Sequence, residues 1–230
     1  MKYSDFEQIL SQERLERYVA ACGGNTKKAM TLYRLNLRLS QEVFTLISCF
    51  EVALRNSINV QLVHSLGNDW LRDCVLTGGR FQVVTEINKT CRIVNDTYQK
   101  LAHEGKYSHS HLLSKMEFGI WKYMFSNPQY RATGRVLLNI FPNRPRSSAT
   151  VQYNNTYIFN ELDKINMLRN RIAHHEPICF MINSDSISTY HVFQQYQRIQ
   201  TLFSWMNIDA RALLYGLDHV QSVCDEINNI

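Results

Sequence analysis

The sequence predicts an all-α protein, and two observations carry that prediction. Nine glycines and four prolines in 230 residues are fewer than the turns of an all-β protein would use. Apolar residues repeat at spacings of three and four along several long segments, and no extended alternation of period two is present. We therefore expect a helical bundle of about seven helices in a single folded chain.

The N-terminal third is expected to hold three helices. The first begins at Ser4, where Glu7 gives the spacing of a capping box, and ends before the glycine pair at 23–24. A second helix is predicted over 27–39 and a third over 41–65. We expect these helices to pack through their apolar faces.

Ser40 is the expected N-cap between the second and third helices. Glu51 falls on the apolar row of the third helix, with Arg55 one turn further along. A charged side chain in a core-facing row needs a partner or a role.

Helical spacing continues through the rest of the chain. Three of the four prolines lie between 126 and 150, which predicts an irregular stretch with one short helix. Further helices are expected over 81–101, 111–125, 131–140, 157–173, 185–206 and 208–228.

Composition narrows the class of protein. The six cysteines form no CxxC pair, so a zinc ribbon or a disulfide framework is not expected. No signal peptide is visible, and the longest apolar-leaning run, 43–54, is too short to span a membrane and contains Glu51. We expect a cytoplasmic protein without a membrane segment. The net charge of +5 allows a polyanionic partner without requiring one.

The segment from Leu168 to Pro177 reads LRNRIAHHEP and places two arginines and two histidines at the end of an apolar helix. Arginine offers a planar fork to phosphate, and histidine exchanges protons near neutral pH. These groups supply what metal-free cleavage of an RNA phosphodiester needs, namely a base, an acid and a cation for the charged phosphorane. The structural alternative is that they solvate and cap the helix end.

Geometry complicates the catalytic interpretation. Arg169 and His174 are five residues apart, which is about 140° around an ideal helix. They share a site if the helix is distorted, if the arginine reaches round, or if a second copy of the chain completes the site.

Three segments resemble a known family. RNRIAHH resembles the Arg-(4 to 6 residues)-His signature of HEPN domains. Tyr33-x-x-Asn36-x-x-Leu39-Ser40 followed by FEVALRN at 50–56 looks like the N-terminal hallmark of the Abi-like family, the AbiD and AbiF group. EFGIW at 117–121 resembles the segment that lies between them in that family.

The resemblance implies a HEPN-like helical domain over 1–230, with N-terminal helices at 1–39, the HEPN core at 40–177 and C-terminal helices at 178–230. It implies a metal-independent endoribonuclease of bacterial abortive-infection or toxin–antitoxin defence, working as a homodimer. An antitoxin protein or a regulatory RNA is a further expected partner.

Site residues carry over from the resemblance one by one. Arg169 and His174 match the catalytic pair, and Asn170 matches the residue that orients groups around the phosphate. His175 also falls within the permitted spacing, and Arg171 is only a candidate phosphate contact. Glu51, Arg55 and Asn56 are interpreted either as support for this pair or as members of a structural ion pair, Glu51–Arg55 or Glu51–Arg169.

A basic window follows Glu117. No acidic residue occurs until Glu161, and eight aromatic residues share the window. Cations and exposed aromatic rings suit single-stranded RNA, although most of these rings are expected in the core. The RNA-contact candidates are Lys122, Arg131, Arg135, Arg144 and Arg146.

No cofactor or metal is expected. Gly78-Gly79 does not lead into a phosphate-binding loop, and the histidines at 109, 111, 174 and 175 have no supporting ligand cluster nearby in the sequence. The alternative to a nuclease is a non-catalytic module that binds RNA or protein in phage defence.

Overall fold

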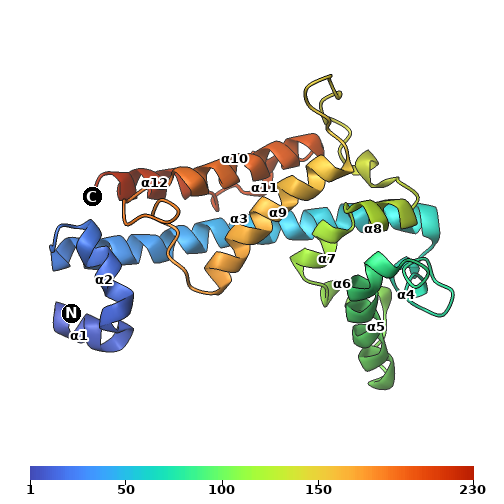
Figure 1. The fold of residues 1–230 in the computed structure, drawn as a ribbon, viewed down its shortest axis with the longest axis horizontal. Helices are drawn as coiled ribbons and strands as arrows, with labels where there is room; N and C mark the ends of the chain where they lie inside the picture. The colour runs from blue at the N-terminus through green and yellow to red at the C-terminus, as the bar shows by residue number, and fades with distance from the viewer. The chain divides into compact units, whose positions relative to one another are not determined.

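The computed structural model describes residues 1–230 and confirms the all-α prediction (Figure 1). It has two 3-10 helices, Thr85–Ile87 and Leu137–Ile140, and no strand; its one antiparallel bridge joins Phe180 and Ile187. The number of helices is larger than the expected seven because several predicted helices are broken. The α-helices are α1 (Tyr3–Leu10), α2 (Gln12–Ala21), α3 (Thr26–Leu66), α4 (Trp70–Asp73), α5 (Asn88–His103), α6 (His109–Ser114), α7 (Phe118–Tyr123), α8 (Asn127–Ala132), α9 (Asn155–Ala173), α10 (Tyr190–Trp205), α11 (Ala210–Leu213) and α12 (Val220–Asn228).

The chain forms two compact units, each built from separate stretches of sequence. Unit 1 contains Met1–Ser48, Met167–Thr201 and Asp209–Ile230. Unit 2 contains Cys49–Asn166 and Leu202–Ile208. Unit 1 carries 11 basic and 11 acidic side chains, whereas unit 2 carries 14 basic and 9 acidic ones and therefore holds the whole net charge of +5.

Unit 1 has a core of aromatic rings from α1, α2, α3 and the segment after α9. Tyr18 and Tyr33 meet edge to face at 5.1 Å between ring centroids, and Phe6 meets Tyr33 at 5.4 Å. Phe180 packs against Tyr18 at 5.1 Å. These contacts join the first helices to the residues that follow the signature helix.

Unit 2 has its own core around the second part of α3. Phe50 packs edge to face on Phe203 at 5.2 Å, and Trp70 and Trp121 are fully buried. The Trp70 indole N–H donates to Asn59 Oδ1 at 2.9 Å, so the buried ring has its polar atom satisfied.

The predicted break at Ser40 is wrong, because α3 runs without interruption for 41 residues. The Ser40 hydroxyl donates to the Asn36 carbonyl at 2.9 Å, so the serine is satisfied inside the helix and caps nothing. No glycine or proline lies between 26 and 66 to end the helix. The capping box at Ser4 is also wrong, since α1 begins at Tyr3 and the Lys2 N–H donates to Asp5.

Other predicted helices are shorter or divided. The helix expected over 81–101 begins at Asn88, and the one over 111–125 becomes α6 and α7. The helix expected from residue 185 begins at Tyr190, because the bridge between Phe180 and Ile187 holds the preceding residues. The last predicted helix divides into α11 and α12, with Gly216 at a positive φ of 73° between them.

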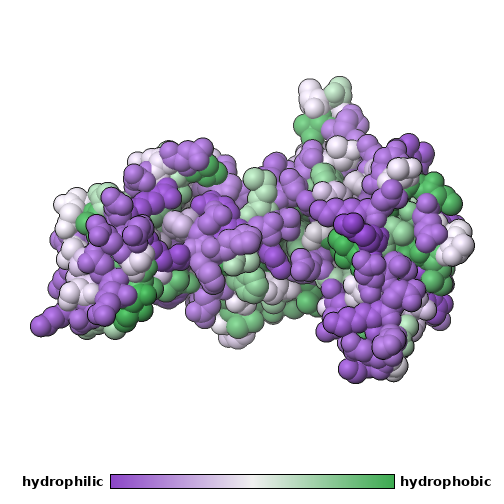
Figure 2. Space-filling model, turned by 60° about the horizontal axis from the view of Figure 1, so that its bottom comes forward, coloured by the Kyte–Doolittle hydropathy of each residue, from purple (hydrophilic) through white to green (hydrophobic).

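α3 is the one helix with the length and composition of a membrane span, with a mean hydropathy of 1.2 over its most apolar window. A third of that window is buried in the protein, and core helices of globular proteins meet the same criteria. Figure 2 shows a face that is mostly hydrophilic, with apolar atoms in small separate areas.

Candidate active site at the end of helix α9

The signature segment lies at the C-terminal end of α9. Ile158, Leu162, Ile165 and Leu168 are fully buried along one face and fix the helix in place. The helix ends in a Schellman turn, in which the Glu176 N–H donates to the Arg171 carbonyl at 2.9 Å and the His175 N–H to the Ile172 carbonyl at 3.0 Å. His175 occupies the left-handed position of this turn, with φ of 57°.

Arg171 holds this turn closed. Its Nε donates to Glu176 Oε2 at 3.2 Å, and its Nη2 donates to the Pro177 carbonyl at 2.7 Å. Because these donors are used within the turn, we assign Arg171 to the turn rather than to a phosphate.

Two residues from the first helices also hold the turn. Arg14 on α2 donates from Nη2 to the His175 carbonyl at 2.7 Å and from Nε to the Tyr33 hydroxyl at 3.0 Å. Asn36 on α3 is 3% exposed, and its Oδ1 accepts from the N–H groups of Ile178 at 2.8 Å and Cys179 at 3.2 Å. Asn36 of the upstream motif therefore contacts the segment that follows the signature helix, and Tyr33 of the same motif is linked to the turn through Arg14.

Arg169, Asn170 and His174 are not used in this way. The Arg169 Nη1 lies 3.4 Å from Asn170 Oδ1, which is long for a hydrogen bond, and Asn170, His174 and His175 are exposed. The His174 N–H donates to the Asn170 carbonyl at 2.9 Å, so the backbone stays helical up to His174. Distortion of the helix, one of the three ways to unite the pair, is therefore wrong, and within unit 1 no hydrogen bond joins Arg169 to His174.

His191 on α10 is a neighbour that the sequence did not single out. It is half-buried, and burial lowers its pKa, as do the charges of Arg171 and Arg198. The neutral imidazole is therefore favoured beside these two guanidinium groups. No sequence signal linked it to α9, because it is 20 residues beyond Arg171.

Glu51, Arg55 and Asn56 lie on the part of α3 that belongs to unit 2. Glu51 and Arg55 are half-buried and Asn56 is exposed. Arg55 Nε donates to Asn56 Oδ1 at 3.3 Å. Their support of the catalytic pair stays a prediction.

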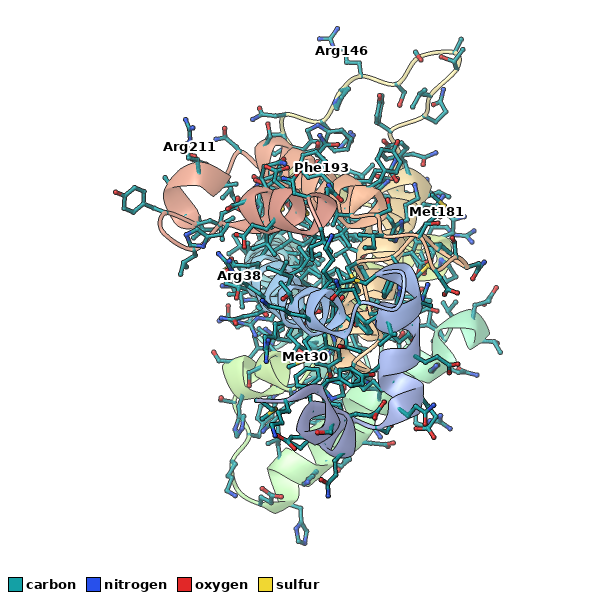
Figure 3. The ribbon with its side chains drawn as sticks, turned by 90° about the vertical axis from the view of Figure 1, so that its left-hand side faces the viewer. Met30, Arg38, Arg146, Met181, Phe193 and Arg211 are labelled. Atoms are coloured by element: carbon teal, nitrogen blue, oxygen red, sulfur yellow. The ribbon has the colours of Figure 1, made fainter.

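The cations of the basic window divide into two kinds. The Lys122 side chain is 7% exposed, and its Nζ pairs with Asp163 Oδ1 at 2.7 Å, so its assignment as an RNA contact is corrected. Arg131, Arg135 and Arg146 are exposed and Arg144 is half-buried. Figure 3 shows Arg146 on a loop that projects from the ribbon.

The aromatic residues of the window are largely internal. Trp121, Phe125 and Phe141 are buried, and Tyr123 is the one that is exposed. Tyr153 and Tyr157 are half-buried and pack on each other at 4.9 Å between ring centroids.

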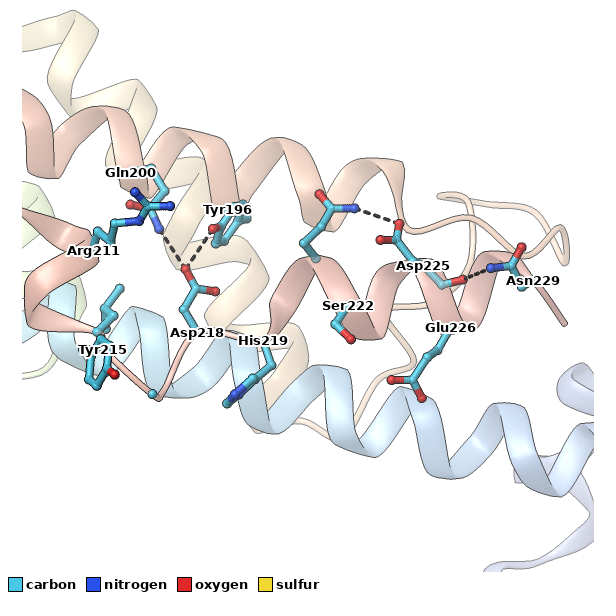
Figure 4. A pocket seen from close by; sticks show the side chains of 13 residues that line it. Tyr196, Gln200, Arg211, Tyr215, Asp218, His219, Ser222, Asp225, Glu226 and Asn229 are labelled. Atoms are coloured by element: carbon cyan, nitrogen blue, oxygen red, sulfur yellow. Dashed lines mark hydrogen bonds between the residues drawn. The ribbon is translucent and has the colours of Figure 1, made fainter.

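A groove that the sequence did not predict lies between α10 and the C-terminal residues of unit 1 (Figure 4). It has a volume of about 840 Å3 and is open to solvent. The Asp218 Oδ2 accepts from the Tyr196 hydroxyl at 2.8 Å and from Gln200 Nε2 at 3.2 Å. Burial and this carboxylate raise the pKa of Tyr196 to about 12, so the phenol stays protonated at neutral pH.

Several of the remaining polar groups of the groove are also partnered. Gln221 Nε2 donates to Asp225 at 2.8 Å, and Glu226 pairs with Arg38 at 2.9 Å. Across the chain, no group of three or more His, Cys, Asp or Glu side chains is placed to hold a metal ion.

Comparisons with known proteins place the chain in a family. The family model described as Abi-like protein matches residues 2–179. Two curated sequences of Buchnera aphidicola subsp. Acyrthosiphon pisum, from strains 5A and APS, are each 30% identical to the chain over 70 residues, and both are named "Probable nicotinate-nucleotide adenylyltransferase". Those 70 residues cover 30% of this chain and 29% of each relative, so the chain spans less than a third of their length.

No solved structure matches the chain. The family match includes Tyr33, Asn36 and the whole signature turn, and it covers most of the sequence. The protein therefore belongs to the Abi-like family.

Proposed function

We propose that the protein is a metal-independent endoribonuclease of bacterial abortive-infection defence. The observation that carries this proposal is that the polar residues at the end of α9 fall into two groups, one bonded within the protein and one not. Arg14, Asn36 and Arg171 hold the turn, whereas Arg169, Asn170 and His174 present polar groups to solvent without a structural partner of normal hydrogen-bond length. Polar side chains kept free on a rigid support are what a catalytic site requires.

The proposed reaction is attack of a ribose 2′-oxygen on its own 3′-phosphate. The P–O bond to the 5′-oxygen breaks, which leaves a 2′,3′-cyclic phosphate and a 5′-hydroxyl. His174 moves the proton, Arg169 stabilises the charge of the phosphorane, and Asn170 orients the phosphate by hydrogen bonds. His175 stays an alternative proton carrier, because its side chain is exposed on the same turn.

The regular geometry of α9 favours a site shared by two copies of the chain. With the backbone helical up to His174, Arg169 and His174 point about 140° apart on one copy. A homodimer places the arginine of one copy beside the histidine of the other, and each two-fold interface then holds two equivalent sites.

The test is a complementation experiment on full-length protein with labelled RNA. R169A and H174A each lower cleavage by about 100-fold or more. Mixing and refolding the two variants restores about a quarter of wild-type activity, because half of the dimers are mixed and each mixed dimer has one intact shared site.

Controls separate the possible outcomes. H103A removes an exposed histidine on α5 and leaves cleavage unchanged. If the mixed variants show no recovery of activity, Arg169 and His174 act together within one copy of the chain. If the wild type and both variants cleave RNA equally, the proposal is overturned. RNA binding without a 2′,3′-cyclic product identifies the non-catalytic module instead, and loss of activity in EDTA contradicts the metal-free reaction.

A further inference from the structure

Several arginines of unit 2 make no ion pair, among them Arg80, Arg131, Arg135, Arg144 and Arg146. In contrast, Lys122 of the same basic window is buried against Asp163. Unit 2 also carries the whole net charge of the chain. Unpaired cations in a charged unit identify a surface where a polyanion would be stabilised.

Four of these arginines gather at the C-terminal end of α8. Arg80, about 50 residues earlier in the sequence, donates from Nη1 to the Ala132 carbonyl at 3.2 Å. Arg131 donates from Nε to the Asn127 carbonyl at 3.2 Å, and the Arg135 carbonyl accepts from the Tyr130 hydroxyl at 2.7 Å. Arg144 donates from Nη1 to the Leu138 carbonyl at 2.9 Å.

The pKa of Tyr130 indicates that Arg135 and Arg144 lie close to its hydroxyl. Burial raises the pKa of Tyr130, and the charges of Arg144 and Arg135 lower it, so both guanidinium groups lie near the hydroxyl. No acidic group contributes to that pKa. The charged groups that act on the Tyr130 hydroxyl are therefore both cations.

Most donors of these side chains remain available. A guanidinium has five N–H donors, and each of Arg80, Arg131 and Arg144 uses one in the hydrogen bonds described above. Arg144 Nε is buried and has no partner, so three of the five Arg144 donors remain for a ligand. A helix C-terminus attracts cations, but four guanidinium groups without a carboxylate exceed what the last carbonyls of a six-residue helix need.

We infer that Arg80, Arg131, Arg135 and Arg144, here called the arginine surface, bind the phosphate backbone of single-stranded RNA. The inference rests on the proposed function and deepens it, because it states where in unit 2 the substrate strand is held. Guanidinium groups bind phosphate oxygens through paired hydrogen bonds, and this binding does not depend on base sequence.

The test measures binding without cleavage. The probe is a fluorescent 2′-O-methyl oligouridine of about 16 nucleotides, whose blocked 2′-oxygen cannot attack. Fluorescence anisotropy with full-length protein gives the Kd over a series of salt concentrations. R135Q/R144Q weakens binding about tenfold or more and lowers the slope of log K against log salt by about 1.4, since each lost contact to a single strand contributes about 0.7.

The control is R92Q, which removes one positive charge, half of what each double variant removes, from an exposed position on α5. It changes the Kd by less than about twofold. If R135Q/R144Q melts below wild type, R80Q/R135Q provides a second pair that keeps the Arg144–Leu138 hydrogen bond. An equal effect of R92Q and the double variants, or no effect of either double variant, overturns the inference.

Failure of the inference and failure of the proposed function are distinguishable. If RNA binding depends on the arginine surface but unmodified RNA is not cleaved, the proposed nuclease function is wrong and the inferred RNA-binding surface stands. If the wild type cleaves RNA but both double variants bind it as tightly as the wild type does, the inferred surface is wrong and the proposed nuclease function stands.

Discussion

The turn after α9 in unit 1 and the arginine surface in unit 2 use the same kind of side chain in opposite ways. In the turn, Arg14 and Arg171 donate to the carbonyls of His175 and Pro177, and the charge of unit 1 is balanced. On the arginine surface, guanidinium groups keep most of their donors and face no carboxylate. The comparison teaches that the partners of a guanidinium group, which include a carboxylate and turn carbonyls in one case and no carboxylate in the other, separate structural arginines from candidate ligand contacts.

The largest effect is expected at Asn36, which links α3 to the segment after the turn. Asn36→Leu leaves the buried N–H groups of Ile178 and Cys179 without an acceptor. The free energy of unfolding falls by about 3 kcal/mol, measured by urea denaturation. Asn170→Leu, at an exposed position, changes it by less than about 0.5 kcal/mol; equal losses would show that Asn36 does not hold the turn.

The next effect tests the buried cation of unit 2. Asp163→Ala leaves the Lys122 ammonium inside the protein without its partner, although Asp163 itself is partly exposed. We expect a loss of about 2 kcal/mol in thermal or chemical unfolding. Lys164→Ala breaks the neighbouring surface pair with Glu161 and costs about 0.5 kcal/mol or less. A neutral Asp163→Ala would mean that Lys122 reaches solvent and is again available to RNA.

The two arginines of the signature segment provide a matched pair. Arg171→Ala removes the hydrogen bonds to Glu176 and Pro177 and lowers the free energy of unfolding by about 1 kcal/mol. Arg169→Ala removes no strong contact and changes it by less than about 0.5 kcal/mol. The opposite order of stabilities would contradict the assignment of Arg171 to the turn.

The smallest effect concerns pH and His109 in unit 2. Its Nε2 lies 2.8 Å from Asn59 Oδ1, and its Nδ1 is buried without a partner. Burial lowers the pKa of His109 below 6.5, partly opposed by Asp69 and assisted by Arg72. The unfolded chain then binds the proton more readily, so the stabilising contribution is full above pH 6.5 and is lost as the pH falls toward the lowered pKa.

Melting temperatures between pH 7.5 and pH 5 measure this dependence. His109→Gln reduces the slope, and a residual slope remains from His191, whose pKa is also lowered. His103→Gln, at an exposed position, keeps the wild-type slope. A wild-type slope in His109→Gln would show that this imidazole does not contribute.

Local patterns predicted some elements well. The helix expected over 157–173 is α9 with two more residues at its start, because its apolar spacing and Pro177 are both local signals. The break expected at Ser40 failed because a serine inside a helix can bond to the carbonyl four residues back. Tertiary contacts could not be predicted from local patterns, because they join residues that are far apart in the sequence. Lys122 is paired 41 residues away, and Arg14 reaches a carbonyl 161 residues away.

His175 adopts a backbone conformation that glycine adopts at no steric cost, with φ of 57°. Histidine at that position forgoes about 1 kcal/mol of stability. A library randomised at residue 175 and selected for heat resistance alone should therefore enrich glycine, whereas selection for activity in a host under phage attack should retain histidine if that imidazole takes part in the chemistry.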